Sequence, residues 1–308
     1  MSYTADVSER SPIQVGLTEL IGFKQAGEAL RTDALRVSAL DAGGHLSRLK
    51  GRGIEFDEAR PYQEGDDLRT IDWRVTARTG KTHTKIFREE RDRPVIIWLD
   101  LRQSMMFATQ GAYKAVRAAQ AAALVAWSAV ANGDRLGGLV FSEQKHVELR
   151  PRLGHRAALN LFRVLTGPAF WKSSHINDDL DKERSLLRLT RVARPGSQIF
   201  LLSDFRGLTA SFEQRLRQLA RHSDISLLQF FDPIEKELPP PGRYQIDMGG
   251  RLISIDTNQM GSREAYRKRF HAIQTPLESL SRLPGVRLLE CSTAADPHKL
   301  LTQHFETR

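Results

Sequence analysis

Residues 94–100 read PVIIWLD and residues 199–204 read IFLLSD. Each stretch is a short apolar run that ends in a carboxylate. A run without polar alternation is typical of a strand buried on both faces, as in a parallel sheet. Helical patterns separate such runs along the chain. This alternation predicts a doubly wound, mainly parallel α/β sheet. The predicted strands are 94–100, 136–142, 199–204, 225–231 and 286–290, and the predicted helices are 112–131, 155–166, 211–221 and 262–281.

The chain ahead of residue 94 has a different character. An apolar helical stripe spans residues 15–40, and Gly22 and Gly27 within it each cost about 1 kcal/mol relative to Ala. This segment therefore needs packing against the rest of the protein, or it breaks into two helices. A densely charged stretch follows it. We divide the chain into an N-terminal helix with a charged segment, residues 1–93, and an α/β domain with a β-hairpin near 243–256, residues 94–308.

Composition excludes several classes of protein. The chain has 308 residues, 40% of them hydrophobic and 27% charged, so it can bury a sizeable core. Its single cysteine, Cys291, cannot form an internal disulfide, which favours a reducing compartment. The longest uncharged stretch, residues 118–133, is shorter than the roughly 20 residues of a membrane span. We expect a soluble, cytoplasmic protein without a secretory signal.

The formal net charge of +9 is unevenly distributed. Residues 150–195 hold 10 Lys and Arg against 4 Asp and Glu. Within them, Arg184, Arg188, Arg191 and Arg194 recur at spacings that place them on one side of a helix. Three interpretations stay open: a solvated helix face, a surface that holds phosphate, or a surface for an acidic protein. Nucleic acid is not favoured, because no lysine-rich block alternates with aromatic residues.

The carboxyl edge of the predicted sheet is where a ligand is expected, because open parallel sheets bind ligands beyond the ends of their strands. Asp100 and Asp204 end two strands there, with Ser104 and Ser203 close by in sequence. Carboxylate and hydroxyl oxygens suit Mg²⁺. The alternative is that both aspartates only end strands or cap helices.

A charged motif precedes the first of these strands. Its residues include Arg60, Tyr62, Gly65, Asp66, Asp67, Arg69, Asp72 and Trp73. The pattern continues at 133–135, at 203–205, and at Asp232, Pro233 and Glu235. Together these residues resemble the bacterial family called domain of unknown function 58. The resemblance implies a von Willebrand factor A-like fold and association with MoxR-type AAA+ ATPases, and it implies no defined reaction.

Von Willebrand A domains usually hold a metal through Asp-x-Ser-x-Ser, a distant Thr and a distant Asp. Asp100 and Ser104 of DLRQS match the first element, and Asp204 matches the distant Asp. Arg102 stands where the first serine is expected. A guanidinium repels a dication and can pair with a carboxylate. Either Arg102 replaces the metal, or it points outward to an acidic partner and leaves a weakened Mg²⁺ site of Asp100, Ser104 and Asp204.

The acidic residues of the motif allow two interpretations. Asp66, Asp67 and Asp72 lie among arginines, which favours an ion-pair network anchored by Tyr62 and Trp73. As metal ligands or acid–base groups they would instead serve catalysis.

Three functions stay open, and the third is sequence-independent nucleic-acid binding. The first is a non-enzymatic adaptor or chaperone partner of a MoxR-type ATPase that recruits a client protein, with Asp100, Arg102, Ser104 and Asp204 as its binding residues. The second is a metal-dependent phosphoesterase or nuclease that uses the aspartate cluster. No catalytic residue is assigned, because the chain lacks a P-loop, a Gly-x-Ser-x-Gly elbow and a His-Glu-x-x-His helix.

Overall fold

The structure is a computed structural model that describes residues 11–30, 54–63, 68–89, 94–171, 180–247, 252–258 and 260–306. The chain forms two compact units. The large unit combines Met1–Ala39 with Arg93–Arg308, and the small unit is Leu40–Asp92. The predicted region 1–93 is therefore distributed over both units, because the N-terminal helices pack within the large one.

The large unit is built on a six-stranded sheet with the order β10-β7-β6-β3-β4-β5. All neighbouring strands are parallel except β4 and β5, which are antiparallel. The mixed α/β architecture with a mainly parallel sheet is thus confirmed. Its strands are β3 (Pro94–Asp100), β4 (Arg135–Phe141), β5 (His146–Arg152), β6 (Gln198–Ser203), β7 (Asp224–Phe231) and β10 (Val286–Ser292).

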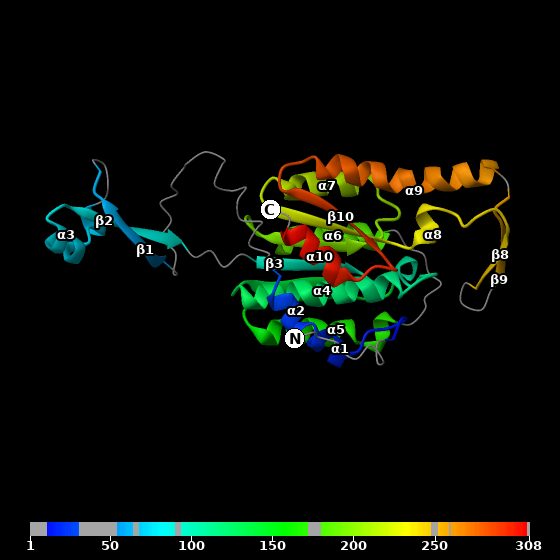
Figure 1. The fold of residues 1–308 in the computed structure, drawn as a ribbon, viewed down its shortest axis with the longest axis horizontal. Coiled ribbons are helices and arrows are strands. Elements are labelled where there is room, and N and C mark those ends of the chain that lie inside the picture. Colours follow the sequence, from blue (N-terminus) through cyan, green and yellow to red (C-terminus); the bar gives the residue numbers. More distant parts are fainter. Residues whose placement is uncertain are drawn as a thin grey trace. The chain divides into compact units, whose positions relative to one another are not determined.

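Helices cover both faces of this sheet, with α4, α5, α1 and α2 on one side of β3 and α7 and α9 on the other (Figure 1). The longer helices are α4 (Lys114–Ala131), α5 (His155–Leu165), α6 (Leu180–Val192), α7 (Ala210–Ala220), α9 (Met260–Ser281) and α10 (Pro297–Glu306). The short ones are α1 (Leu17–Gly22), α2 (Lys24–Glu28) and α8 (Pro233–Lys236), with single turns η4 (Gln103–Met105) and η5 (Pro168–Phe170).

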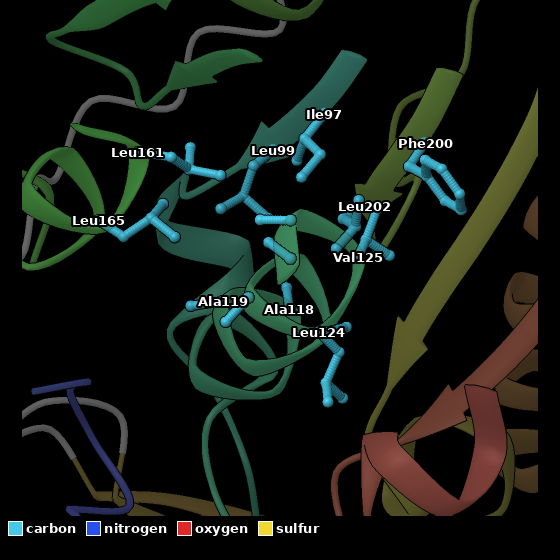
Figure 2. Close-up of a cluster of buried hydrophobic side chains, with 14 of the residues drawn as sticks. Ile97, Leu99, Ala118, Ala119, Leu124, Val125, Leu161, Leu165, Phe200 and Leu202 are labelled. Atoms are coloured by element: carbon cyan, nitrogen blue, oxygen red, sulfur yellow. The ribbon is translucent and has the colours of Figure 1, made fainter. Parts of the chain in front are cut away.

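Successive residues of each buried strand point into two different cores, as the two-residue period of a strand requires. Ile97 and Leu99 of β3 join the core formed with α4 and α5, whereas Ile96 and Trp98 join the core formed with α6, α7 and α9. Figure 2 shows the first core, where Leu202 of β6 lies beside Val125 of α4. Burial on both faces explains why these strands are apolar throughout.

The N-terminal segment breaks into two helices, which is one of the two outcomes predicted for it. Helix α1 ends at Gly22, Phe23 lies between the helices, and α2 follows. Both helices contact α4, and the Trp127 indole N–H donates to the Leu20 carbonyl at 3.0 Å. The predicted continuation to residue 40 lies outside the described residues beyond Leu30.

The predicted hairpin forms, but it does not extend the large sheet. Strands β8 (Arg243–Asp247) and β9 (Leu252–Asp256) pair antiparallel in a separate two-stranded sheet. The strand that completes the large sheet on this side is β10, as predicted. Among the helices that the structure describes, none is both long and apolar enough to cross a membrane.

The small unit is a second two-stranded sheet with a helix. Strand β1 (Ile54–Pro61) pairs antiparallel with β2 (His83–Glu89), and η3 (Leu68–Thr70) and α3 (Trp73–Thr79) lie between them in sequence. Asp72 caps α3, because its carboxylate accepts from the backbone N–H groups of Arg74 and Val75 at 3.0 and 3.1 Å. Neither strand of this pair was predicted from the sequence.

We predict that Gly27→Ala lowers the melting temperature by several degrees. A Cβ at Gly27 would lie 2.6 Å from Trp127 Cβ and 2.7 Å from the Leu124 carbonyl oxygen, so α2 must move away from α4. Overpacking of this kind costs about 1–3 kcal/mol. The matched control is Gly22→Ala, where no heavy atom lies within 4 Å. Calorimetric melting that shows equal effects of the two substitutions would contradict the close packing of α2.

Candidate functional site

Four neighbouring parallel strands of the large sheet each have a carboxylate at or just beyond their last residue, all at the same edge. Asp100 is the last residue of β3, Asp204 follows β6 and Asp232 follows β7. Glu143 lies two residues beyond β4. Because these strands are parallel, their carboxyl ends meet. The structure therefore brings the predicted Asp100 and Asp204 to one edge. It adds Asp232, which the sequence analysis named in the family pattern but not in the site, and Glu143, which it did not name.

Asp100 and Arg102 form a buried bidentate ion pair. Arg102 Nε donates to Asp100 Oδ1 at 2.9 Å, and Arg102 Nη2 donates to Oδ2 at 2.8 Å. Asp100 is 0% exposed and Arg102 is 4% exposed. Burial alone lowers the pKa of Arg102, but the charge and hydrogen bonds of Asp100 raise it above its ordinary value. The guanidinium therefore stays charged and turns inward, toward the carboxylate that ends β3.

Two further donors complete the shell of Asp100. The backbone N–H of Arg102 donates to Oδ1 at 3.0 Å, and the Ser203 hydroxyl donates to Oδ2 at 2.7 Å. The carboxylate thus accepts four hydrogen bonds, which is about the number that its lone pairs can take. Ser203 links the ends of β3 and β6, and its oxygen also accepts from the Phe205 N–H at 3.0 Å.

Lys114 neutralises the second predicted aspartate. Its ammonium group, 0% exposed, donates to Asp204 Oδ2 at 3.1 Å and to Glu235 Oε1 at 2.8 Å. Lys114 is the first residue of α4, a helix that is buried from Lys114 to Ala129 except at Arg117. Sequence reasoning missed this residue. The available signal was a lone lysine at the start of an apolar helix, because a buried ammonium requires carboxylate partners.

Arg206 closes the cluster on its solvent side. Its Nη2 donates to Glu235 Oε1 at 2.6 Å, and its Nε lies 3.7 Å from Asp204 Oδ2. The Arg206 side chain is 50% exposed, whereas Glu235 is buried. Two cations thus face two carboxylates, and the charge of Arg206 is partly open to solvent.

Asp232 holds three loops together. Its carboxylate accepts from the Thr109 N–H and hydroxyl at 2.7 and 2.5 Å, and from the Thr293 hydroxyl at 2.7 Å. It also caps α8 by accepting from the Ile234 N–H at 3.1 Å. Burial by itself raises the pKa of Asp232, but these hydrogen bonds outweigh burial and hold the pKa below its ordinary value. The carboxylate is therefore charged at neutral pH and structural.

The turn after β6 is strained and tightly held. Phe205 has a φ of 53°, in the left-handed region that favours glycine, and its side chain is fully buried. Such a conformation costs about 1–2 kcal/mol in a non-glycine residue. The turn persists because the flanking Ser203 and Asp204 side chains accept from the backbone N–H groups of Phe205 and Arg206. Asp204, which precedes Phe205 in this turn, pairs with Lys114.

Ser104, the third predicted metal ligand, takes no part in these contacts. It lies in η4, and its hydroxyl oxygen is buried without a hydrogen-bond partner among the described residues. Nearby, Glu143 accepts from the Gln103 N–H at 2.7 Å, and burial raises the pKa of Glu143 above its ordinary value. The loop that carries Ser104 is thus fixed by Gln103 and Arg102.

The donor set at this edge does not fit a divalent cation. Magnesium requires about six oxygen ligands in octahedral geometry. Of the three predicted ligands, Asp100 already accepts four hydrogen bonds and Asp204 is paired with an ammonium group. Only the Ser104 hydroxyl has no hydrogen-bond partner among the described residues. Within the described part of the chain, no group of three or more His, Cys, Asp and Glu is arranged to hold a metal.

The residues of the charged motif belong to the small unit, whereas the carboxyl edge belongs to the large unit. Arg60 and Tyr62 lie in and just after β1, and Arg69 lies in η3. Trp73 is 70% exposed, so its side chain is not buried within the small unit. It is the first residue of α3, a helix in which no residue is buried. Gly65, Asp66 and Asp67 lie outside the described residues.

The single cysteine offers no nucleophile. Cys291 lies in β10, is buried, and has a pKa raised by burial. A thiol of raised pKa carries little thiolate, the reactive form.

The carboxylates of this edge and the cations paired with them fall within a family match. The model of the family described as "Protein of unknown function DUF58" matches residues 58–275. The chain belongs to this family. The uncharacterized proteins Rv1480 of Mycobacterium tuberculosis (strain ATCC 25618 / H37Rv) and Mb1516 of Mycobacterium bovis are each 33% identical to it over 221 residues, covering 70% of this chain and 68% of each relative.

Two solved structures are similar to this DUF58 protein in part. BatB from Bacteroides thetaiotaomicron gives a TM-score of 0.43 at 17% identity, covering 70% of this chain and 97% of that chain. An aerotolerance-related membrane protein from Bacteroides fragilis gives a TM-score of 0.42 at 14% identity, covering 70% of this chain and 100% of that one.

We predict that Lys114→Met destabilises the large unit by about 3 kcal/mol. The substitution keeps the volume but leaves Asp204 and Glu235 buried with only the partly exposed Arg206, and unpaired buried charges are costly. The control is Lys236→Met, which removes a half-exposed pair with Glu290 and costs less than about 1 kcal/mol. Denaturant unfolding measures both changes. A small effect at Lys114 would mean that the cluster is not a structural requirement.

Proposed function

We propose that this protein is a non-enzymatic interaction module with a von Willebrand factor A-like domain, and that it serves as adaptor or chaperone partner of a MoxR-type AAA+ ATPase. The observation that carries the proposal is the internal neutralisation of the carboxyl edge. Asp100 is paired with Arg102, and Asp204 with Lys114, inside the protein. Side chains used in this way brace loops, and they are not available as acids, bases or metal ligands.

The braced loops present an ordered surface to a partner. Thr109 and Gln110 are exposed, and their backbone N–H groups donate to the buried Asp232 carboxylate at 2.7 and 3.4 Å. Arg206 places a half-exposed guanidinium at the same edge. A surface held by buried charges is rigid before binding, which lowers the entropic cost of association. In this proposal the buried residues position the surface, and the exposed residues touch the partner.

The proposal favours the metal-free alternative for Arg102. A tethered guanidinium supplies next to Asp100 the positive charge that a bound cation would supply, and it does so independently of cation concentration. The domain resembles von Willebrand A domains in the position of the site, with an arginine in place of a serine. A cytoplasmic location is part of the proposal, because an ATP-driven partner works where ATP is available.

The alternative, a metal-dependent phosphoesterase or nuclease, needs carboxylate oxygens that are open to a cation. Its support is the aspartate cluster itself, together with the arginine-rich residues 150–195. The bidentate pair and the buried lysine weigh against it, because both would have to be displaced before a cation could bind.

A pull-down with two matched glutamine substitutions tests the partner surface. Gln110→Arg adds a long cationic side chain at the carboxyl edge, and Gln218→Arg adds the same side chain on the exposed part of α7. We expect a lysate of the source organism to yield an AAA+ ATPase, identified by mass spectrometry, with the wild type and Gln218→Arg. Recovery should fall at least fivefold with Gln110→Arg. Equal recovery by all three proteins, or by none, would contradict the proposal.

Calorimetric titration with Mg²⁺ and Mn²⁺ tests the metal-free site. We expect neither cation to bind to the wild type at millimolar concentration, because the Arg102 guanidinium donates hydrogen bonds to both carboxylate oxygens of Asp100. Arg102→Ser restores the serine of the metal-binding pattern and removes the two guanidinium donors from Asp100, so this variant should bind Mg²⁺ more tightly than the wild type does. Tight Mg²⁺ binding by the wild type, or Mn²⁺-dependent hydrolysis of a phosphodiester, would favour the enzymatic alternative.

A further inference from the structure

The amino edge of the large sheet, opposite the site described above, contains a pocket of about 660 Å³. The paired first residues of β3 and β4, Pro94 and Arg135, contribute to its wall. Its volume lies within the range of about 300–1,000 Å³ that is usual for small-molecule sites. Five arginines line it together with one carboxylate: Arg135, Arg150, Arg188, Arg191, Arg194 and Glu148.

The secondary structure explains why these side chains converge. Glu148 and Arg150 alternate with Val147 and Leu149 along β5, so they share its exposed face while the apolar pair packs on the core below. Helix α6 lies on that exposed side of the sheet, because Leu186 and Leu189 join the other core.

Helix α6 supplies its polar side to the pocket. Arg188 and Arg191 are three residues apart and therefore neighbours on the helix surface. Arg194 follows two residues after the helix ends at Val192. The polar side of α6 and the exposed face of β5 thus form facing walls, and both carry arginine.

Close approach of β5 to β4 is built into the sequence. The register of the two strands shifts between Leu136 and Gly138. A Cβ at Gly137 would lie 2.8 Å from Cγ of Pro151, so only glycine lets β5 lie so near at this point. Arg150 adjoins this proline, and Arg135 begins the partner strand. The wall of the pocket is therefore fixed by backbone packing.

The charge of the pocket is unbalanced. Glu148 is the one carboxylate among the described residues that line it, against five guanidinium groups. Arg188 also contacts the imidazole of His146. Several like charges around one volume repel each other, and a multivalent anion relieves that repulsion. We propose that this pocket binds a small soluble anion that carries two or more closely spaced phosphate groups.

The residues that line the pocket favour a polyphosphate over a nucleotide base or an acidic peptide. Arginine recognises phosphate through two parallel N–H donors, and several arginines can hold adjacent phosphates at once. Among the described residues that line the pocket there is no aromatic side chain on which a nucleobase could stack. An acidic peptide spreads its charges over flexible side chains and needs a longer groove. This site is separate from the carboxyl edge and independent of the function proposed for it.

Calorimetric titration of the full chain with sodium tripolyphosphate tests the proposal. The double substitution Arg191→Gln with Arg194→Gln should weaken binding at least about tenfold, because two charge-assisted hydrogen-bonding groups are lost. Its matched control is Arg217→Gln with Arg221→Gln, which removes the same charge from exposed positions of α7 and its C-cap. This control should bind as the wild type does.

A variant that is expected to tighten binding distinguishes an effect on the binding site from a loss of folded protein. Glu148→Gln removes the carboxylate from the pocket and should tighten tripolyphosphate binding about threefold. Binding of both wild type and variant should weaken as salt is raised. The proposal is overturned if the Arg191 and Arg194 double variant binds like the wild type. It is also overturned if Glu148→Gln weakens binding, or if a hexaglutamate peptide binds as tightly with the same dependence on these residues.

Discussion

Charge balance inside the protein is the constraint on which the carboxyl edge depends. Asp100, Asp204, Asp232 and Glu235 are all buried, and burying a carboxylate is costly unless cations or N–H and O–H groups surround it. The protein meets this requirement with Arg102, from the loop after β3, and Lys114, from the start of α4. The Arg102 link is local, but Lys114 joins segments that are distant in sequence, because its partners lie 90 and 121 positions away. The loops therefore take one arrangement, because any other leaves a buried charge without a partner.

The position of Lys114 in turn depends on how α4 is packed. The helix lies against the sheet, and α2, α5 and α10 also contact it. A helix enclosed in this way has little room for large side chains, and half of its sequence KAVRAAQAAALVAWSAVA is alanine. Small side chains let neighbouring backbones approach. At Gly27 of α2 the approach to Trp127 is so close that even a Cβ atom does not fit. The same close packing that excludes bulk also excludes water, so the ammonium group at the first residue of α4 must find carboxylates within the protein.

Much of the fold was predictable because its strands are buried on both faces. The apolar composition of PVIIWLD and IFLLSD identifies them as buried strands. The aspartates that end them mark the edge of the sheet where the charged residues lie. Strand β5 was missed because its residues alternate between exposed and half-buried and include Pro151, which reads as a loop. The pairing of Arg102 with Asp100 was one of two alternatives from sequence, since two residues of separation allow the contact without requiring it. The carboxylate partners of Lys114 could not be predicted, because they come from segments about a hundred residues away and are brought to it only by the packing of the fold.

The two edges of the sheet show why net charge is a poor guide to what a protein binds. At the carboxyl edge, Asp100, Asp204 and Glu235 are paired with cations. Asp232 is held by hydrogen bonds from the loops instead. At the amino edge, five arginines surround one carboxylate, so much of the excess of basic residues within 150–195 is gathered in one pocket. Both edges contain arginine, but their chemistry differs because of what lies beside it. Arg102 has a carboxylate two residues away on the same chain, and its charge is used in folding. Arg191 and Arg194 face other arginines, and that repulsion is a cost that the folded protein retains until an anion binds.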